Sequence, residues 1–254
     1  MKSSNTSTPY ELDYLEELIR DFPCDKQIAS IDAFNIIRVR YLELEKRLPI
    51  IQKQILQKPP AEGFKDTIEE LISNNDYQPL HLYNLSIVLH KYLFDEILSN
   101  AGEFRKITDP FNGLVGFGGN HRRMPGNFTF NGTNPLLIRN DLVKTFQLLT
   151  ITQTDPVRTS LEFYRQFVKV HPFYDANGRI GRFIVSAYLS TFGLYVKWRE
   201  LEQRSMHNQF IKRLNECHKR EGDENYPKYF NYLLQTFHKF VTKTTDFISD
   251  SEEF

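Results

Sequence analysis

Residues 171–182, which read HPFYDANGRIGR, contain several groups that act in phosphoryl-type transfer. His171 has a side chain whose ordinary pKa lies near neutrality, so it can accept a proton from a hydroxyl group. Asp175 supplies a carboxylate in the same segment, and such a carboxylate can hold a Mg²⁺ ion that bridges phosphates. Transfer of this kind depends mainly on positioning and charge stabilisation, which this set of residues can provide.

A turn of small residues stands between the carboxylate and the next predicted helix. The turn is Ala176-Asn177-Gly178, and the start of a helix exposes unpaired N–H groups at its positive end. Such a helix start is suited to binding a di- or triphosphate. Arg179 and Arg182 are three residues apart, so they share one helix face from which both reach phosphate oxygens. We therefore predict that this turn and its two arginines bind a phosphate-containing ligand.

Each of these residues also has a structural interpretation when it is taken alone. A single histidine is more often structural than catalytic, an aspartate before a helix is usually a cap, and two arginines at this spacing usually face solvent. Their convergence within one short segment favours the functional interpretation. Phe173 is the exception, because we expect it to anchor the loop in the core in either case.

Helices are predicted on both sides of this segment, because apolar residues recur at spacings of three and four along most of the chain. The segment joins the predicted helices 155–170 and 178–192, and Gly193 gives a stop signal for the second. We predict an all-α protein with further helices at residues 10–22, 30–56, 80–98, 135–150, 201–220 and 226–247.

Glycine interrupts the helical pattern between residues 109 and 135. Seven of the twelve glycines lie in or just before this stretch, and a helix does not persist through such a run. Two short extended pieces remain, at 114–117 and at 127–130. We predict a small β-hairpin that projects from a helical body.

The chain divides, in our interpretation, into an N-terminal helical extension at residues 1–75, a core domain at 76–248 and an acidic tail at 249–254. The polar stretch 58–75 is the expected junction between extension and core. A length of 254 residues suits one large domain with an appended helical segment.

Composition argues against several classes of protein. Lysine plus arginine and aspartate plus glutamate number 32 each, so no basic excess attracts nucleic acid or an anionic membrane. No apolar run approaches the roughly 20 residues that span a bilayer. The N-terminal residues lack the apolar core of a signal peptide, and only Cys24 and Cys217 occur. A cytoplasmic location is the simplest expectation, and a translocated effector stays open.

Residues 171–182 resemble the signature of the Fic family, which reads His-x-Phe-x-Asp/Glu-Gly/Ala-Asn-Gly-Arg and ends in a second arginine. Every defined position of that signature is matched here. The resemblance extends over roughly residues 80–234, where Leu89-His90, Leu93-Phe94 and residues 101–105 (AGEFR) look like the family's first core helix and the turn after it. It implies a Fic fold, with a helical bundle core and a short β-hairpin flap over the active site.

The resemblance implies a protein adenylyltransferase, which moves AMP from ATP, with Mg²⁺ as cofactor, onto a Ser, Thr or Tyr hydroxyl of a target protein or of itself. Carried over residue by residue, His171 is the catalytic base and Asp175 the Mg²⁺ ligand. The nucleotide-binding residues are then Ala176, Asn177, Gly178, Arg179 and Arg182. The protein substrate would dock at the flap, about residues 114–131, and a homodimer is left open.

Other activities stay open. A branch of the family that transfers phosphate has lysine where Gly178 stands, and a branch that transfers phosphocholine usually lacks the second arginine, so Gly178 and Arg182 favour AMP. The motif does not distinguish transfer of UMP or removal of AMP. Two alternatives from other classes are a nucleotide-binding module without turnover, which the intact His171 disfavours, and a nucleic-acid-binding helical protein, which the neutral charge disfavours.

Many Fic proteins carry an inhibitory helix whose motif is Ser/Thr, three residues, Glu, then Gly/Asn, and whose glutamate pairs with the second arginine of the signature. The segment from Ser30 to Asn35 fits this motif except that Phe34 replaces the glutamate. A coincidental match in an ordinary helix is the competing interpretation. If the match is real, the inhibitory charge is missing and the enzyme is expected to be free of this restraint.

Overall fold

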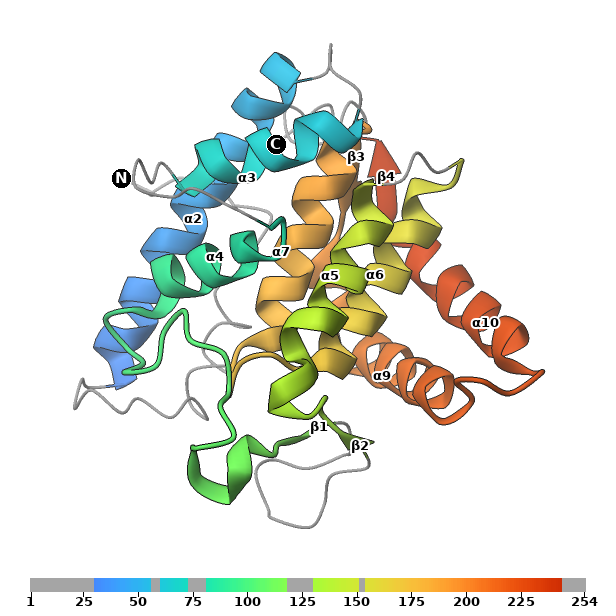
Figure 1. The fold of residues 1–254 in the computed structure, drawn as a ribbon. Coiled ribbons are helices and arrows are strands. Elements are labelled where there is room, and N and C mark those ends of the chain that lie inside the picture. The colour runs from blue at the N-terminus through green and yellow to red at the C-terminus, as the bar shows by residue number, and fades with distance from the viewer. Residues whose placement is uncertain (1–29, 56–59, 73–80, 118–129, 151–153, 244–254) are drawn as a thin grey trace.

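The computed structural model describes residues 30–55, 60–72, 81–117, 130–150 and 154–243, without the side chains of some helical residues, among them Phe34 and residues 48–55. Helices dominate this part of the chain and the strands form short antiparallel pairs (Figure 1), so the predicted all-α fold with a small hairpin is confirmed. None of the helices in these ranges has both the length and the apolarity of a membrane span. The predicted helix 10–22 lies outside the described residues.

The elements follow in chain order. The α-helices are α2 (Ser30–Ile55), α3 (Pro60–Ile72), α4 (Asn84–Phe94), α5 (Ile138–Thr150), α6 (Pro156–Val170), α7 (Asn177–Ser190), α8 (Trp198–Glu202), α9 (Arg204–Lys219) and α10 (Tyr226–His238). The 3-10 helices are η1 (Pro110–Gly113) and η2 (Pro135–Leu137). The strands are β1 (Gly116–Phe117), β2 (Phe130–Asn131), β3 (Leu194–Val196) and β4 (Val241–Lys243).

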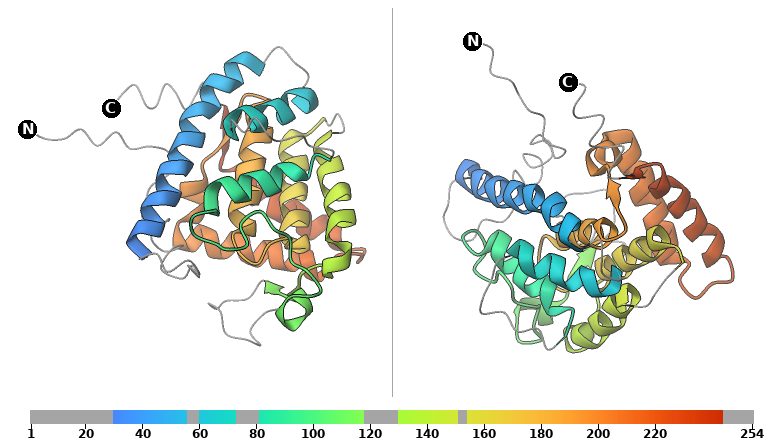
Figure 2. Two further views of the ribbon diagram at one scale, coloured as in Figure 1. Left: turned by 60° about the vertical axis from the view of Figure 1, so that its left-hand side comes forward. Right: turned by 90° about the horizontal axis from the view of Figure 1, so that it is seen from above.

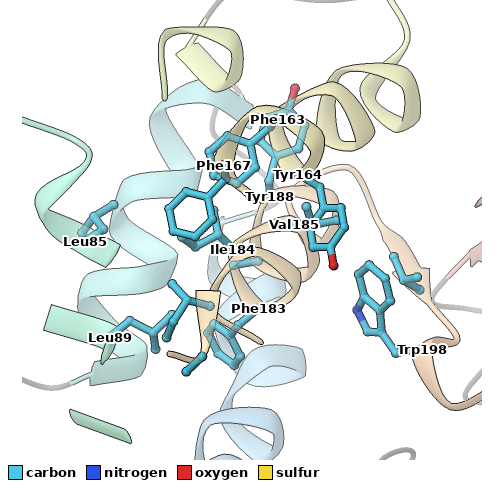
Figure 3. Packing of buried hydrophobic residues seen from close by; sticks show 14 of the residues in the cluster. Leu85, Leu89, Phe163, Tyr164, Phe167, Phe183, Ile184, Val185, Tyr188 and Trp198 are labelled. Carbon is cyan, nitrogen blue, oxygen red and sulfur yellow. The ribbon is translucent and has the colours of Figure 1, made fainter. Parts of the chain in front are cut away.

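Helix α7 is the centre of the core. Every residue in it from Phe183 to Ser190 is buried, which is the pattern of a helix that other helices surround. Helices α2, α3, α4 and α6 all contact α7, and Figure 2 shows them arranged around it. Figure 3 shows the apolar side chains that meet in this layer, among them Leu85, Leu89, Phe163, Phe167, Ile184 and Tyr188.

Gly181 lets α6 approach α7 closely. A Cβ atom at this position would lie 3.1 Å from Cδ2 of Tyr164 and 3.2 Å from Cδ1 of Phe167, both on α6. These distances are shorter than ordinary van der Waals contacts, so a larger residue would push the two helices apart. The close approach matters because the segment 171–182, which carries the candidate site residues, joins the end of α6 to the start of α7.

The N-terminal helices share the core of the rest of the chain. Ala33, Ile37 and Leu44 on α2 are buried, at a spacing that places them on one helix face. Tyr41 on that face meets Phe183 of α7 edge-on, with ring centroids 5.8 Å apart. One apolar cluster runs from α2 through α7 to the C-terminal helices. Residues on both sides of the predicted boundary between extension and core therefore belong to the same apolar cluster.

The polar stretch 58–75, expected to be a junction, contains a helix that its composition did not indicate. This helix is α3, in which Phe64, Ile68 and Leu71 are fully buried. The three positions follow a four-and-three spacing, which places them on one helix face. Charged residues at other positions of α3 hide this pattern when the stretch is judged by its average polarity.

The predicted helix 226–247 is too long, and the structure corrects it. Helix α10 ends at His238, and residues 241–243 form β4, which pairs antiparallel with β3. Val241 stands opposite Val196 in this register. Valine loses side-chain freedom in a helix and packs well on an extended strand, so pairing with β3 prevails over continuation of the helix.

The predicted hairpin is present. Strands β1 and β2 pair antiparallel, with Gly116 opposite Asn131 and Phe117 opposite Phe130. The rings of Phe117 and Phe130 lie 5.4 Å apart between centroids, so each side chain packs against its cross-strand neighbour. Residues 118–129, which join the strands, lie outside the described part of the chain. We refer to this strand pair as the flap.

Candidate active site

The motif loop, residues 171–176, connects α6 to α7 and has a left-handed residue at each end. His171 caps the C-terminus of α6 with φ 51° and ψ 57°, and its N–H donates to the carbonyl of Phe167 at 3.1 Å. Ala176 precedes α7 with φ 60° and ψ 7°. Left-handed conformations are costly for residues other than glycine, and such strain is typical of functional sites.

His171 is held in the protonation state of a base. Its Nδ1 lies 3.2 Å from the carbonyl oxygen of Val168, and a carbonyl only accepts hydrogen bonds, so Nδ1 carries the proton of the neutral ring. Nε2 is then left with its lone pair. The ring stacks on Phe117 of the flap, with centroids 5.5 Å apart. Burial, assisted by the charge of Arg105, lowers the pKa of His171 to about 4, so the ring is neutral near pH 7.

The side chain of Asn177 is used inside the loop. Its Oδ1 accepts from the N–H of Phe173 at 2.9 Å, and its Nδ2 donates to the carbonyl of Phe173 at 2.8 Å. The side chain is buried. If Asn177 contacts a nucleotide, it therefore does so through its main-chain N–H at the start of α7.

Phe173 anchors the motif loop in the core. Its ring is fully buried and stacks on His90 of α4, with centroids 4.0 Å apart and 15° between the ring planes. Nδ1 of His90 accepts from the N–H of Gly102 at 2.9 Å, so the proton of this neutral ring is on Nε2. Burial lowers the pKa of His90 to about 3. Sequence reasoning did not identify His90 as a support of the loop.

The two arginines of α7 lie in different surroundings. Arg179 is buried, and its guanidinium lies 5.9 Å from the ring centroid of Phe94 on α4. Arg182 is half-buried, and its guanidinium lies 5.9 Å from the ring centroid of Trp198 on α8. Gly178 is beside Arg182, because a Cβ atom there would lie 3.8 Å from Nη2 of Arg182. Arg182 is therefore the more exposed arginine and lies next to the glycine of the predicted phosphate site.

Asp175 stands just before the start of α7 and is half-buried. Its Oδ1 accepts from the N–H of Ala176 at 2.6 Å. Within the residues that the structure describes, no group of three or more histidine, cysteine or acidic side chains is placed to hold a metal ion by itself. Mg²⁺ is often bound through one or two carboxylates together with substrate phosphates and water. A single carboxylate at the start of α7 fits that mode of binding.

Two residues in the segment between α4 and the flap hold the motif loop from outside. Asp109 accepts a hydrogen bond from the hydroxyl of Tyr174 at 2.6 Å. Arg105, which is buried, donates from Nε to the carbonyl of His171 at 2.7 Å. Neither residue was predicted to act at the site, because nothing in their local sequence shows that the chain returns to the loop at this point.

The comparison with family models assigns residues 82–189 to the Fic/DOC family. These residues are a Fic/DOC family domain. The Fic/DOC domain begins just before α4 and ends within α7, so it contains the flap, α5, α6 and the whole motif loop. None of the curated proteins compared with the chain matches it.

Solved structures with a similar fold include the following three. A Fic family protein from Desulfovibrio desulfuricans G20 has a TM-score of 0.51 and 14% identity, over 96% of this chain and 77% of that chain. The N-terminal Fic domain of a VirB-translocated Bep effector from Bartonella quintana, with bound ADP, has a TM-score of 0.46 and 16% identity, over 83% and 88%. BepC from Bartonella tribocorum, with bound AMPPNP, has a TM-score of 0.44 and 14% identity, over 81% and 88%. At this identity the first structure supports the fold alone.

Helix α2 precedes the Fic/DOC domain and carries the predicted regulatory residues. Ser30 is its first residue, and Asn35 is exposed. The side chains of Ser30 and Phe34 lie outside the described part of the chain, so a contact between them and the Fic/DOC motif stays a prediction.

Proposed function

We propose that this protein is an adenylyltransferase, which transfers AMP from Mg-ATP to a hydroxyl group of a target protein. The observation that carries the proposal is the state of His171 in a Fic/DOC domain. Its Nδ1 is committed to the carbonyl of Val168, which leaves Nε2 as a base, and its lowered pKa keeps the ring neutral. The ring lies against Phe117 of the flap. A base in this place can accept the proton of a hydroxyl group that docks at the flap.

The start of α7 supplies the groups that would bind the phosphates of ATP. The first N–H groups of a helix have no partner within the helix, and the helix dipole adds a positive potential there. Gly178 has no side chain to keep a phosphate away, and Arg182 lies beside it. Asp175 would hold Mg²⁺, which when bound neutralises charge on the phosphate oxygens.

The proposed reaction is a displacement at phosphorus. The oxygen of the target hydroxyl forms a bond to the α-phosphorus of ATP, the bond from that phosphorus to the bridging oxygen of the β-phosphate breaks, and pyrophosphate leaves. Nε2 of His171 accepts the hydroxyl proton. Arg182 and the N–H groups at the start of α7 stabilise the negative charge on the phosphate oxygens during transfer.

Docking of the target at the flap is supported by the geometry of the strand pair. An edge strand presents unpaired N–H and C=O groups, to which an extended segment of another protein can add as a further strand. Phe117 of β1 stacks on His171, so a segment that adds to the flap as a further strand beside β1 lies close to the base.

Two residues favour AMP over the other groups considered. Gly178 stands where a phosphate-transferring relative would have lysine, and Arg182 offers a cation to the terminal phosphate of a triphosphate. The alternatives are transfer of UMP or phosphocholine, and binding of a nucleotide without turnover. They differ in the donor from which label reaches protein, so one set of incubations separates them.

The test uses the purified protein with Mg²⁺ and a cell lysate. Separate incubations contain ATP labelled at the α-phosphate, ATP labelled at the γ-phosphate, UTP labelled at the α-phosphate, or CDP-choline labelled in the choline. We expect label in protein only from α-labelled ATP, and mass spectrometry should find AMP on a hydroxyl side chain.

A histidine pair provides the matched variants for this assay. His171→Ala should reduce transfer on the order of 10²–10⁴-fold while ATP binding is retained, because the general base is lost. His238→Ala should transfer normally, because His238 is exposed on α10. Label from γ-labelled ATP, UTP or CDP-choline would overturn the proposal in favour of another transferase. ATP binding without transfer from any donor would support a nucleotide-binding module instead.

A further inference from the structure

Arg105 is bound to the main chain on both sides of the proposed base. Its Nε donates to the carbonyl of His171 at 2.7 Å, and its own main-chain N–H donates to the carbonyl of Pro172 at 3.0 Å. Its Nη2 donates to the carbonyl of Val170 at 3.2 Å. One residue from the segment after α4 therefore holds three consecutive carbonyls where α6 ends and the motif loop begins.

The same guanidinium holds both ends of the flap. Nη1 donates to the carbonyl of Gly113, which precedes β1, and Nη2 donates at 2.9 Å to the carbonyl of Thr133, which follows β2. Gly132 packs between the two groups: a Cβ atom there would lie 3.0 Å from Nη2 of Arg105 and 3.0 Å from Cβ of His171. The flap ends, Arg105 and His171 are thus in direct mutual contact.

The guanidinium of Arg105 donates to main-chain carbonyls. Arg105 is only 2% exposed, and the acceptors of its side-chain hydrogen bonds among the described residues are all main-chain carbonyls. Carbonyls at the C-terminus of a helix lack partners within the helix and carry partial negative charge, so they stabilise a buried cation. A guanidinium enclosed in this way is not placed to bind a phosphate.

We propose that Arg105 is a positioning residue that couples the flap to His171, a role that rests on the proposed transfer reaction. By binding the flap ends and the carbonyl of His171 together, Arg105 sets the place of a flap-docked hydroxyl relative to Nε2. A guanidinium suits this task because its donors are fixed in a planar fork and reach several carbonyls at once. A lysine keeps the charge, but its donors radiate from a single nitrogen.

Four variants test this role. Arg105→Lys and Arg105→Gln are compared with Arg165→Lys and Arg165→Gln. Arg165 is the matched control because it is also fully buried and lies on α6, but it pairs with Glu162 and Glu221 and not with the motif loop or the flap. Thermal unfolding of all four variants measures the general cost of altering a buried arginine.

Amide hydrogen exchange measures how firmly Arg105 holds the flap ends, and it needs no assay of activity. The N–H of Gly132 donates to the carbonyl of Val115, and the N–H of Thr133 donates to the carbonyl of Val170. Exchange at these two amides should become on the order of tenfold faster in both Arg105 variants, because the hydrogen bonds that hold the flap ends are lost. The Arg165 variants should keep wild-type protection there.

The transfer assay reads the consequence for the reaction. We expect kcat to fall on the order of 10²-fold in both Arg105 variants, because a base misplaced by about 1 Å costs that much. KM for ATP should stay unchanged. Titration of His171 by NMR separates charge from geometry: Arg105→Gln removes a positive charge and raises the pKa of His171, whereas Arg105→Lys keeps the charge.

Several results would overturn the coupling role. These are wild-type exchange at Gly132 and Thr133 with wild-type kcat, a raised KM for ATP in the Arg105 variants, or equal losses of kcat in the Arg165 variants. Failure of both Arg105 variants to fold, while the Arg165 variants fold, would assign Arg105 to general stability and overturn the role as well. If the wild-type protein transfers no AMP, the proposed function fails, and the exchange measurement still decides whether Arg105 couples the flap to His171.

Discussion

The side-chain amide of Asn177 binds both main-chain groups of Phe173, accepting from its N–H at 2.9 Å and donating to its carbonyl at 2.8 Å. These two bonds close the motif loop upon itself. Phe173 is in turn stacked on His90, so the start of α7 is tied to α4 through the loop. A binding site that is ordered in advance loses little conformational freedom when a ligand binds.

Asn177→Asp should lower the free energy of unfolding by about 1–3 kcal/mol. The aspartate keeps the acceptor for the N–H of Phe173, but it cannot donate to the carbonyl and it brings a charge into a buried place. Urea unfolding measures the change. Asn208→Asp is the control, because Asn208 is exposed on α9 and its replacement should cost less than about 0.5 kcal/mol. Equal losses in the two variants would mean that the paired bonds do not stabilise the loop.

Arg182→Ala and Arg179→Ala should affect different measurements. Arg182 is the more exposed and lies beside Gly178, so its loss should weaken ATP binding on the order of tenfold or more, as expected when charged hydrogen bonds are removed. Arg179 is buried against Phe94, so its loss should lower Tm by several degrees. Calorimetric titration with ATP and thermal unfolding of both variants give the comparison. The opposite assignment of the two effects would contradict the prediction.

Ala176→Gly should stabilise the protein by up to about 1.6 kcal/mol. Relief of the left-handed conformation at φ 60° is worth about 1–2 kcal/mol, and the greater freedom of glycine in the unfolded chain takes back about 0.4–1 kcal/mol. Ala176→Val should have the opposite sign, because a β-branched residue tolerates this conformation worse than alanine. Urea unfolding of the two variants checks both signs. A glycine variant less stable than the valine variant would refute the strain at this position.

Stability should fall as the pH drops below about 6.5. Burial lowers the pKa of His90 to about 3, of His171 to about 4 and of His218 to about 3. Each lowered pKa means that the unfolded chain takes up a proton before the folded chain does. The stabilisation is therefore complete above the unfolded pKa of about 6.5, and it is lost at about 1.4 kcal/mol per pH unit for each histidine as the pH falls towards 4.

A variant pair isolates one of these histidines. His218→Leu removes a buried ring whose nitrogens make no hydrogen bond to the described residues. The slope of the free energy of unfolding against pH, between pH 6 and 5, should become shallower by about the contribution of one histidine. His238→Leu, at an exposed position of α10, is the control for replacing a histidine by leucine. Urea unfolding at a series of pH values gives the slopes. An unchanged slope in His218→Leu would show that this ring takes up its proton in the folded state.

Phe34→Glu should install inhibition of transfer. Tyr41 meets Phe183, and α2 and α7 both run upward in Figure 1. Position 34 precedes Tyr41 by seven residues, which is about two helical turns, and an equal step back from Phe183 reaches Ala176 at the start of α7. A carboxylate at position 34 would thus stand level with the motif and compete with the terminal phosphate for Arg182.

Phe34→Gln is the control for that experiment, because glutamine is polar and similar in length but uncharged. We expect the wild-type protein to transfer AMP without an activating change, Phe34→Gln to do the same, and Phe34→Glu to be slower at low ATP concentration. Equal rates in Phe34→Glu and Phe34→Gln would show that the match from Ser30 to Asn35 is coincidental.

The motif could be predicted from the sequence because its chemistry is local. His171, Asp175 and the two arginines of α7 fall within one short segment, so their proximity needs no knowledge of the fold. The flap could also be predicted from the sequence, because the glycines around it exclude a helix. The two short strands found there, β1 and β2, agree with that reasoning.

Arg105 shows why the supports of the site were harder to predict. Its partners are main-chain carbonyls at Gly113, Thr133 and the end of α6, and a carbonyl is present at every residue, so no side-chain type marks the contact. The same holds for β4, where pairing with a distant strand overrides a local helical pattern. Helix α3 was not predicted for another reason. Its three buried apolar residues stand among charged ones, so the average hydrophobicity of the stretch is low.

Strand β3 follows α7 directly, whereas its partner β4 follows α10, so the chain from α8 to α10 forms a loop whose two ends are hydrogen-bonded to each other. During synthesis α7 and the helices before it emerge well ahead of β4. The central helix can therefore be enclosed by α2, α3, α4 and α6 while this loop is still open. Closure of a long loop loses entropy before its strand pairing compensates for it. The C-terminal helices should consequently join the core late and together, as one cooperative unit in the folding of the chain.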